Sequence, residues 1–214
     1  MNDSPKNKGL RKKLVLELMK KGISDENVLK SINKIPRHLF IHQDFENFAY
    51  VDKPFPIGFE QTISQPYTVA FQTQALEIKI GDKVLEIGSG SGYQTSILVS
   101  MKAEVYSIER IYGLYKKSKR ILSALNLMPR KISWDDGYVG SEKDAPFDKI
   151  LIAASCTEIP MNLVKQLKVG GKMIIPIGNH KNQIMNLITR ISKNKIKKTE
   201  MGNFLFVPML MNKI

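Results

Sequence analysis

Hydrophobic residues follow two different spacings along this chain of 214 residues. Helical spacing, with apolar residues three or four positions apart, is found in residues 4–21, 24–35, 66–76, 93–101, 111–126 and 157–167. Short apolar runs with the length of buried strands are found in residues 83–87, 104–108, 131–134, 147–153 and 172–176. This alternation predicts an α/β fold in which a mostly parallel sheet carries helices on both faces.

Both ends of the chain predict additions to this core. Near the start, Gly22 ends a basic amphipathic helix, and Ser24 is predicted to cap the next helix, whose first turn is acidic. Near the other end, residues 184–190 and 203–208 are typical of strands, and a polar turn at 193–195 lies between them. We expect these strands to be antiparallel additions at the edge of the sheet.

Neither spacing is kept between Phe40 and Tyr67, where aromatic residues and prolines are scattered. We expect a long irregular loop there, and such a loop inside a compact domain is usually functional. Pro66 is suited to the first turn of the following helix, which places Ser64 or Gln65 at its N-cap. The free N–H groups at this helix start are suited to an anion, although a simple capping role for Ser64 is the alternative.

A glycine-rich turn follows the first predicted strand of the core and opens a helix. Gly88, Gly90 and Gly92 let the backbone turn tightly and approach a ligand closely. Tyr93 stands where a dinucleotide-binding motif would have its last glycine. Glu86, two positions before the turn, is better placed for the ammonium group of an amino-acid-bearing nucleoside than for a pyrophosphate. The motif resembles the first motif of S-adenosylmethionine-dependent methyltransferases.

Acidic residues also follow the next two predicted strands. Glu109 ends the second strand, where a carboxylate can accept hydrogen bonds from both ribose hydroxyls. The turn Asp135-Asp136-Gly137 ends the third strand, where an adenine amino group can be bound, because ligands of open α/β sheets lie outside these strand ends. An ordinary turn is the alternative for that segment.

The composition is that of a single domain, because 43% hydrophobic residues can fill one core. We divide it into N-terminal helices with a substrate loop (1–70), a cofactor-binding core (71–182) and C-terminal edge strands (183–214). The 33 basic and 20 acidic residues give a net charge of +13, which suggests nucleic acid. The lysines form separate clusters without interleaved aromatic residues, so we expect no specific nucleic acid partner.

Other residue types exclude further classes. Cys156 is the single cysteine, which excludes an internal disulfide and a multi-cysteine metal site. His38, His42 and His180 are scattered, and we interpret the first two as surface or helix-end residues, with no metal site. The chain begins without a signal-peptide pattern, and no run of about eighteen apolar residues could span a membrane. We therefore expect a cytoplasmic protein without membrane contacts.

Five stretches of the chain resemble, in the same order, the protein-L-isoaspartate O-methyltransferase family. They are Pro36-Arg37 with Leu39-Phe40, residues 56–58 with 61–67, residues 84–95, residues 145–148 with 158–160, and residues 167–178. The segment 61–67, Gln-Thr-Ile-Ser-Gln-Pro-Tyr, is the most specific, because other methyltransferases share the glycine motif but not this segment. The resemblance covers nearly the whole chain and implies a Rossmann-like methyltransferase fold that binds S-adenosyl-L-methionine.

The resemblance also implies a reaction and a set of site residues. The reaction is methyl transfer to the free carboxylate of L-isoaspartyl residues in damaged proteins, which starts repair through a succinimide; D-aspartyl residues are a second candidate substrate. The family's active-site serine falls on Ser64, and its substrate-binding positions fall on Gly58, Thr62 and Ile63. Its cofactor-binding positions fall on Glu86, Gly88, Ser89, Gly90, Gly92, Glu109, Arg110, Asp136 and Gly137. We expect a monomer that acts on isoaspartyl proteins and peptides.

Two departures from the family pattern and two alternative functions remain. Asp135 replaces the first glycine of the family's Gly-Asp-Gly turn, and residues 153–157 lack the prolines that relatives more often carry there. The alternatives are an RNA methyltransferase, suggested by the charge, and a non-catalytic protein that binds the cofactor and isoaspartyl proteins. Against the first, Cys156 has no second cysteine to resolve a base adduct. Against the second, the glycine motif and Ser64 are intact.

The lack of a strong general base fits carboxyl methylation. A carboxylate is already a nucleophile, so its attack on a sulfonium methyl group needs alignment and exclusion of water. We expect Ser64 and the backbone N–H groups of residues 58–64 to hold the substrate carboxylate about 3 Å from the methyl group. The substrate backbone is expected to pair with exposed backbone near the irregular loop and the tail.

Overall fold

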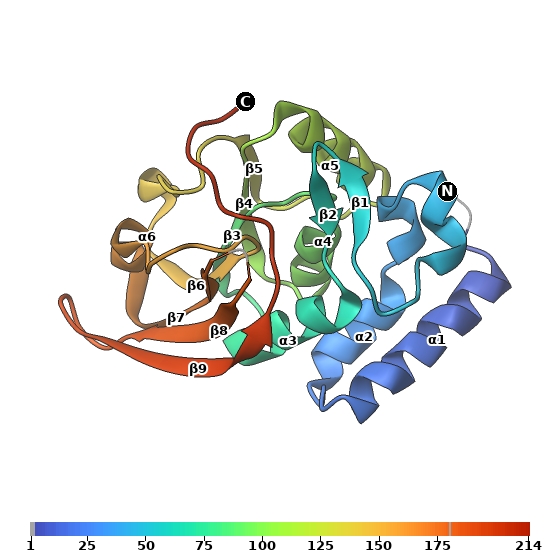
Figure 1. Cartoon of the computed structure of the whole chain (residues 1–214), viewed down its shortest axis with the longest axis horizontal. Helices are drawn as coiled ribbons and strands as arrows, with labels where there is room; N and C mark the ends of the chain where they lie inside the picture. The colour runs from blue at the N-terminus through green and yellow to red at the C-terminus, as the bar shows by residue number, and fades with distance from the viewer. Residues whose placement is uncertain (1–2, 180) are drawn as a thin grey trace.

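Seven strands form one sheet within the residues that the computed structural model describes, 3–179 and 181–214 (Figure 1). Their order across the sheet is β5-β4-β3-β6-β7-β8-β9. The parallel strands are β3 (Lys83–Ile87), β4 (Glu104–Glu109), β5 (Lys131–Trp134), β6 (Phe147–Ile152) and β7 (Leu167–Gly178). The antiparallel strands are β8 (Gln183–Arg190) and β9 (Ile196–Phe204). The predicted mostly parallel sheet with antiparallel edge strands is confirmed.

Helices cover both faces of this sheet, as predicted. They are α1 (Pro5–Lys20), α2 (Glu26–Lys34), α3 (Pro66–Leu76), α4 (Tyr93–Ser100), α5 (Tyr112–Ala124) and α6 (Met161–Lys165). Neighbouring residues of a strand point to opposite faces. Val84 and Leu151 therefore join a buried cluster with α1 to α5, whereas Leu85 and Ile150 join a second cluster with α6.

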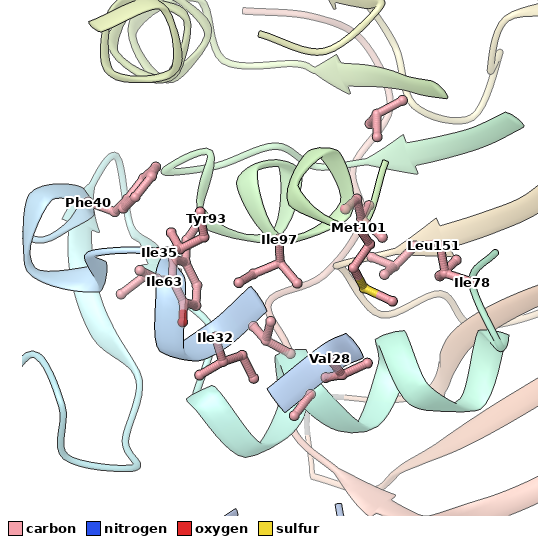
Figure 2. Close-up of a cluster of buried hydrophobic side chains, with 14 of the residues drawn as sticks. Val28, Ile32, Ile35, Phe40, Ile63, Ile78, Tyr93, Ile97, Met101 and Leu151 are labelled. Carbon is pink, nitrogen blue, oxygen red and sulfur yellow. The ribbon is translucent and has the colours of Figure 1, made fainter. Parts of the chain in front are cut away.

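The N-terminal helices complete the larger cluster. Val28 and Ile32 of α2 and Ile97 of α4 point into the same buried interior (Figure 2). All three side chains are fully buried, and burial of a side chain of this kind stabilises the fold by about 1.5–3 kcal/mol. The first two helices are therefore packed into the same core as the sheet.

The cap of α2 differs from the prediction. The prediction that Ser24 caps this helix is wrong, because Asp25 is the N-cap residue. Its carboxylate accepts hydrogen bonds from the N–H groups of Asn27 at 2.8 Å and Val28 at 3.2 Å. A carboxylate at a helix start also interacts favourably with the helix dipole, which a neutral serine does not.

The segment between Phe40 and Tyr67 is not the structureless loop that the sequence predicts. Its elements are the end of the 3-10 helix η1 (Arg37–Phe40), the 3-10 helix η2 (Gln43–Phe48) and a hairpin of β1 (Phe55–Gly58) and β2 (Gln61–Ile63). Phe59 and Glu60 form the turn of this hairpin with positive φ angles of 55° and 57°. Non-glycine residues rarely adopt this conformation, so the sequence carries no turn signal there.

Two predicted elements beyond β6 are also wrong. The helix predicted at 157–167 is limited to the short α6, because β7 already begins at Leu167. Strand β7 passes through Gly170 where its pairing with β6 is irregular, so the glycines do not mark the start of the strand. The strand predicted at 203–208 lies earlier, as β9, because this edge strand is mostly exposed and lacks an apolar pattern.

After β9 the chain crosses the carboxyl ends of the parallel strands (Figure 1). The Ser155 N–H donates a hydrogen bond to the Val207 carbonyl at 2.8 Å, and the Met209 N–H donates to the Ser155 carbonyl at 2.8 Å. These bonds hold the segment beside the loop that follows β6. Residues near the end of the chain are thereby brought to the same side of the sheet as the glycine turn.

Candidate active site

A cavity lies at the carboxyl ends of β3, β4 and β6. The predicted site residues that line it are Thr62, Ile63, Ser64, Gly88, Ser89, Gly90, Glu109, Arg110 and Gly137. The predicted site residues that do not line it are Gly58, Glu86, Gly92 and Asp136. The structure thus brings the Ser64 segment, the glycine turn and the end of β4 around one space.

The glycine turn requires glycine for two different reasons. Gly88 and Gly90 have φ angles of 89° and 52° where they line the cavity, and other residues rarely adopt such angles. Gly92 also has a positive φ angle, and a Cβ added there would lie 3.3 Å from the side chains of Leu122 and Ser118 of α5. Gly92 therefore permits the close packing of α5 rather than contact with a ligand.

Glu109 fixes the shape of this turn from the end of β4. Its side chain is buried, with 4% of the residue exposed. One carboxylate oxygen accepts a hydrogen bond from the Gly90 N–H at 2.8 Å, and the other accepts one from the Ile111 N–H at 2.9 Å. Burial raises the pKa of Glu109, although these backbone hydrogen bonds oppose the increase. Each oxygen keeps a lone pair for a further donor in the cavity.

Glu86 lies beneath the cavity rather than in it. The residue has no exposed surface, and one of its oxygens accepts hydrogen bonds from the hydroxyls of Thr95 at 2.6 Å and Ser107 at 2.5 Å. Its other oxygen has no partner among the described residues. Burial raises the pKa of Glu86 to about 7. In this arrangement the carboxyl group holds β4 and α4 against β3.

Ser64 stands where the cavity meets a second hollow. This groove continues from the cavity and is lined by residues of α3, β9 and the segment after β9. The residues that line both hollows are Thr62, Ser64, Ala153 and Val207. Among the described residues, the Ser64 hydroxyl has no hydrogen-bond partner, so it is available to a ligand. A molecule in the cavity and another in the groove would meet beside this hydroxyl.

The sequence did not identify one wall of the cavity. This wall consists of Val207, Pro208, Met209 and Leu210, the segment that crosses the strand ends. The sequence predicted that the tail lies near the substrate, but not that these residues line the cavity. Gln94, in the first turn of α4, also lines the cavity and was not predicted. Its place directly after the glycine turn was the signal that could have revealed it.

A family model described as Protein-L-isoaspartate(D-aspartate) O-methyltransferase matches residues 9–213. The chain belongs to this family. A protein-L-isoaspartate O-methyltransferase of Flavobacterium psychrophilum is 53% identical over 213 aligned residues, with 100% coverage of both chains. One of Dictyoglomus turgidum is 44% identical over 207 residues, 97% of this chain and 94% of the relative.

Solved structures of the same description share the fold. A Plasmodium falciparum protein described as a protein-L-isoaspartate O-methyltransferase, in complex with S-adenosyl-L-homocysteine, matches with a TM-score of 0.82 and 28% identity. The match covers 94% of this chain and 99% of that one. Another protein-L-isoaspartate O-methyltransferase matches with a TM-score of 0.85 and 28% identity over 95% of this chain and 67% of its own. The predicted Rossmann-like methyltransferase fold is confirmed.

The residues at the two departures from the family's sequence pattern make specific contacts in the structure. Asp135 turns its carboxylate outward to Lys213, with 3.7 Å between the charged atoms. Asp136 accepts hydrogen bonds from the N–H groups of Tyr138 at 2.8 Å and Asn212 at 2.7 Å, so it holds its own turn and the end of the chain. In the second departure, residues 153–157, the Ser155 backbone holds the crossing segment.

Cys156, also within that second departure, is buried against Met209, with 3.3 Å between the sulfur atoms. Burial raises the pKa of its thiol to about 11, which opposes a thiolate nucleophile. His38 lies in the short 3-10 helix η1 and is buried, with its ring nitrogen 2.7 Å from the Tyr50 hydroxyl, so of the two interpretations, surface or helix-end residue, the first is wrong. His180 lies outside the described residues.

Neither a metal site nor a membrane-spanning helix is present in residues 3–179 and 181–214. These residues contain no group of three or more His, Cys, Asp or Glu side chains that could hold a metal ion. Within the same ranges, every helix is too short or too polar to cross a membrane.

Proposed function

We propose that this chain transfers the methyl group of S-adenosyl-L-methionine to the side-chain carboxylate of L-isoaspartyl residues in proteins. The observation that carries the proposal is that Ser64 lines both the cavity at the glycine turn and the adjoining groove. A methyl donor in the first and a peptide in the second would meet at this residue. The methyl ester formed on an isoaspartyl carboxylate leads to a succinimide, from which normal aspartate can be recovered.

The residues at the glycine turn fit the cofactor. Gly88 and Gly90 present backbone without side chains to the cavity, and Glu109 keeps acceptor capacity for ribose hydroxyls after bonding Gly90 and Ile111. The crossing residue Met209 contributes an apolar surface on the opposite wall. When bound, the cofactor supplies an electrophilic methyl group on a sulfonium. The protein supplies orientation and a cavity that excludes water.

The substrate side requires few chemical groups. The attacking carboxylate is already a nucleophile, so no proton has to be removed from it. The Ser64 hydroxyl donates a hydrogen bond to the carboxylate oxygen that does not react, and this fixes the other oxygen toward the methyl group. The groove takes the flanking peptide along Tyr67, Phe204 and Leu205, whose apolar surfaces accept many different side chains. Activity on D-aspartyl residues is part of the same proposal.

The monomer and the cytoplasmic location also remain our proposals. The cavity and the groove are both lined by residues of one chain, so a second copy is not needed to complete them. The single cysteine, Cys156, is buried and reduced, as is usual for proteins of reducing compartments. Light scattering on the purified protein tests the first proposal, and a dimeric mass would contradict it.

The test of the reaction uses two synthetic peptides that differ only in having isoaspartate or aspartate at one position. With labelled S-adenosyl-L-methionine, we expect a base-labile methyl ester on the isoaspartyl peptide alone. Ser64→Ala should lower kcat by about a hundredfold, because a loss of alignment has effects of that size. Cofactor affinity should stay unchanged, since the glycine turn and Glu109 are intact. Ser192→Ala, at an exposed serine of the β8–β9 turn, is the matched control.

Each alternative function predicts a different result. Unchanged turnover in Ser64→Ala would contradict the role of the serine. If neither peptide is labelled while the cofactor binds, the chain is a binding protein or uses another substrate, and RNA is then the next substrate to assay. The raised pKa of Cys156 opposes an RNA methyltransferase that attacks a base carbon through a cysteine.

A further inference from the structure

Asp52 is a buried carboxylate outside the cavity, just before the β1–β2 hairpin. Its side chain is 3% exposed. One oxygen accepts a hydrogen bond from the Tyr67 N–H at 2.7 Å. The other accepts hydrogen bonds from the Gln65 side-chain amide at 3.0 Å and the Lys21 ammonium at 2.6 Å. A buried charge needs such partners, and all three come from elements that are distant from Asp52 in the sequence.

The Tyr67 bond gives helix α3 a cap from outside the helix. The N-cap residue of α3, Gln65, makes no side-chain capping bond, and Pro66 at the next position has no N–H. The first free N–H group of the helix is therefore that of Tyr67, and Asp52 accepts it. This helix start lies directly after Ser64, so the cap also fixes the position of the backbone at Ser64.

The two bonds to Gln65 and Tyr67 join both ends of the hairpin segment. Residues 53–64, which include the hairpin, begin directly after Asp52 and end directly before Gln65. The carboxylate therefore connects the start of this segment to its end. A third contact supports the start, because the Arg37 guanidinium donates to the Lys53 carbonyl at 3.0 Å. The segment between these points carries Thr62, which lines the cavity and the groove with Ser64.

We propose that Asp52 is a positioning residue for methyl transfer, which closes the base of the hairpin and thereby sets the position of Ser64. The inference rests on the proposed function, because one of its tests measures methyl transfer to the isoaspartyl peptide. Asp52 touches neither hollow, so it acts through Gln65 and Tyr67 and not on the substrate. Lys21 serves a different purpose, since it neutralises the buried charge from the end of α1.

Three variants separate positioning from charge neutralisation. Asp52→Ala removes every bond, and we expect kcat with the isoaspartyl peptide to fall about thirtyfold, within the range that misplacement causes. Asp52→Asn keeps an acceptor for the Tyr67 N–H and an amide that can bond a rotated Gln65 amide, so kcat should recover to within about threefold of wild type. Lys21→Met leaves both bonds to the hairpin base, so kcat should stay within about twofold while the melting temperature falls.

Two readouts distinguish positioning from a loss of folding. The dissociation constant for S-adenosyl-L-homocysteine should be the same in Asp52→Ala as in wild type, because the hydrogen bonds of Asp52 go to Lys21, Gln65 and Tyr67 and not to the glycine turn. Hydrogen exchange of the amides of residues 55–64 should be faster in Asp52→Ala, with β3 unchanged. Should Asp52→Ala not fold, Asp52→Ser replaces it with the same expectations, because its hydroxyl is too short to reach Gln65 and Tyr67 together.

Specific outcomes would overturn the inference. It is wrong if Asp52→Ala keeps wild-type kcat, if Asp52→Asn is as impaired as Asp52→Ala, or if the Asp52→Ala loss extends equally to cofactor binding. Failure of the proposed function is a separate result. In that case the wild-type protein does not methylate the isoaspartyl peptide, and the exchange rates of residues 55–64 still decide whether Asp52 holds the hairpin.

Discussion

The two halves of the site are held in place by different kinds of contact. The cofactor half, residues 86–92 with Glu109, is built at the ends of adjacent parallel strands, and its main connection runs from Gly90 to Glu109. The substrate half comprises the β1–β2 hairpin, Ser64 and the crossing segment 207–210. It is fixed by Asp52, which directly precedes the hairpin and bonds the start of α3, and by the Ser155 backbone, which comes from a distant part of the chain.

This difference indicates how the halves should respond to change. The cofactor half has buried polar groups with few alternative partners, so a single substitution there should cause a large loss of cofactor affinity or a clear change in stability. Apart from Ser64 itself, the substrate half has an exposed turn and several independent attachments, so changes at the turn and the attachments should have smaller, graded effects. The following predictions test that contrast.

The largest effect is expected at Glu109. Glu109→Ala removes the acceptor of the Gly90 and Ile111 N–H groups and the acceptor proposed for the ribose hydroxyls. Affinity for S-adenosyl-L-homocysteine should fall by about a hundredfold or more, because hydrogen bonds to a charged group contribute about 1.5–3 kcal/mol. Calorimetric titration measures it. The control Glu104→Ala lies at the exposed start of the same strand, and equal losses in both variants would contradict the assignment.

A smaller effect on stability is expected at Glu86. The pKa of this buried carboxyl is raised to about 7 from an ordinary 4.5, so the unfolded chain ionises first as the pH rises. The folded state therefore loses stability from about pH 4.5 upward until Glu86 itself ionises near 7, and the loss then levels off. Between about pH 5.5 and 8 the contribution of Glu86 should fall by roughly 2 kcal/mol.

Urea unfolding at several pH values tests this dependence. Glu86→Gln should remove that part of the pH dependence, because an amide does not ionise. The free energy of unfolding of this variant should therefore rise relative to that of wild type as the pH rises. Glu46→Gln, at an exposed carboxyl, should follow the wild-type curve. Parallel curves for Glu86→Gln and wild type would show that Glu86 does not titrate in this interval.

The smallest effect is expected where the hairpin turn contacts α5. A Cβ added at Gly113 would lie 2.2 Å from the Phe59 ring, which must therefore move. Phe59 is 59% exposed and can do so at low cost. Gly113→Ala should raise the KM for the isoaspartyl peptide about two- to threefold, corresponding to roughly 0.5 kcal/mol, without changing cofactor affinity. Gly9→Ala, at an unobstructed helical glycine, is the control. A larger change in cofactor affinity than in KM would contradict the separation of the halves.

The same contrast explains how far the sequence could predict the molecule. Parallel strands are buried on both faces, so β3 and β6 appear as short segments rich in apolar residues, and Glu109 is found by its place at a strand end. The hairpin has no such local signal, because its turn is made by Phe59 and Glu60 and its base is closed by Asp52. Within the part of the chain that the structure describes, its strands form a separate two-stranded sheet.

The cavity wall at 207–210 could not be predicted for a related reason. Its position depends on contacts between Ser155 and Val207, which are 52 residues apart. Glu86 shows a limit of another kind. Its spacing from the glycines was recognised, but the hydroxyls of Thr95 and Ser107 that turn it away from the cavity come from other elements. The hydrophobic pattern of a sequence predicts which residues are buried, but it does not predict which partner each buried residue contacts.

Residues 207–210 are translated long after the glycine turn. A growing chain folds its earlier parts first, so β3, the turn and α4 can form while the crossing segment is still missing. At that stage the cavity is open on the side that Met209 and Leu210 later cover. Tight cofactor binding is therefore expected only after that segment has been synthesised and has bonded to Ser155. Nascent chains that lack it should not withdraw cofactor from the cell.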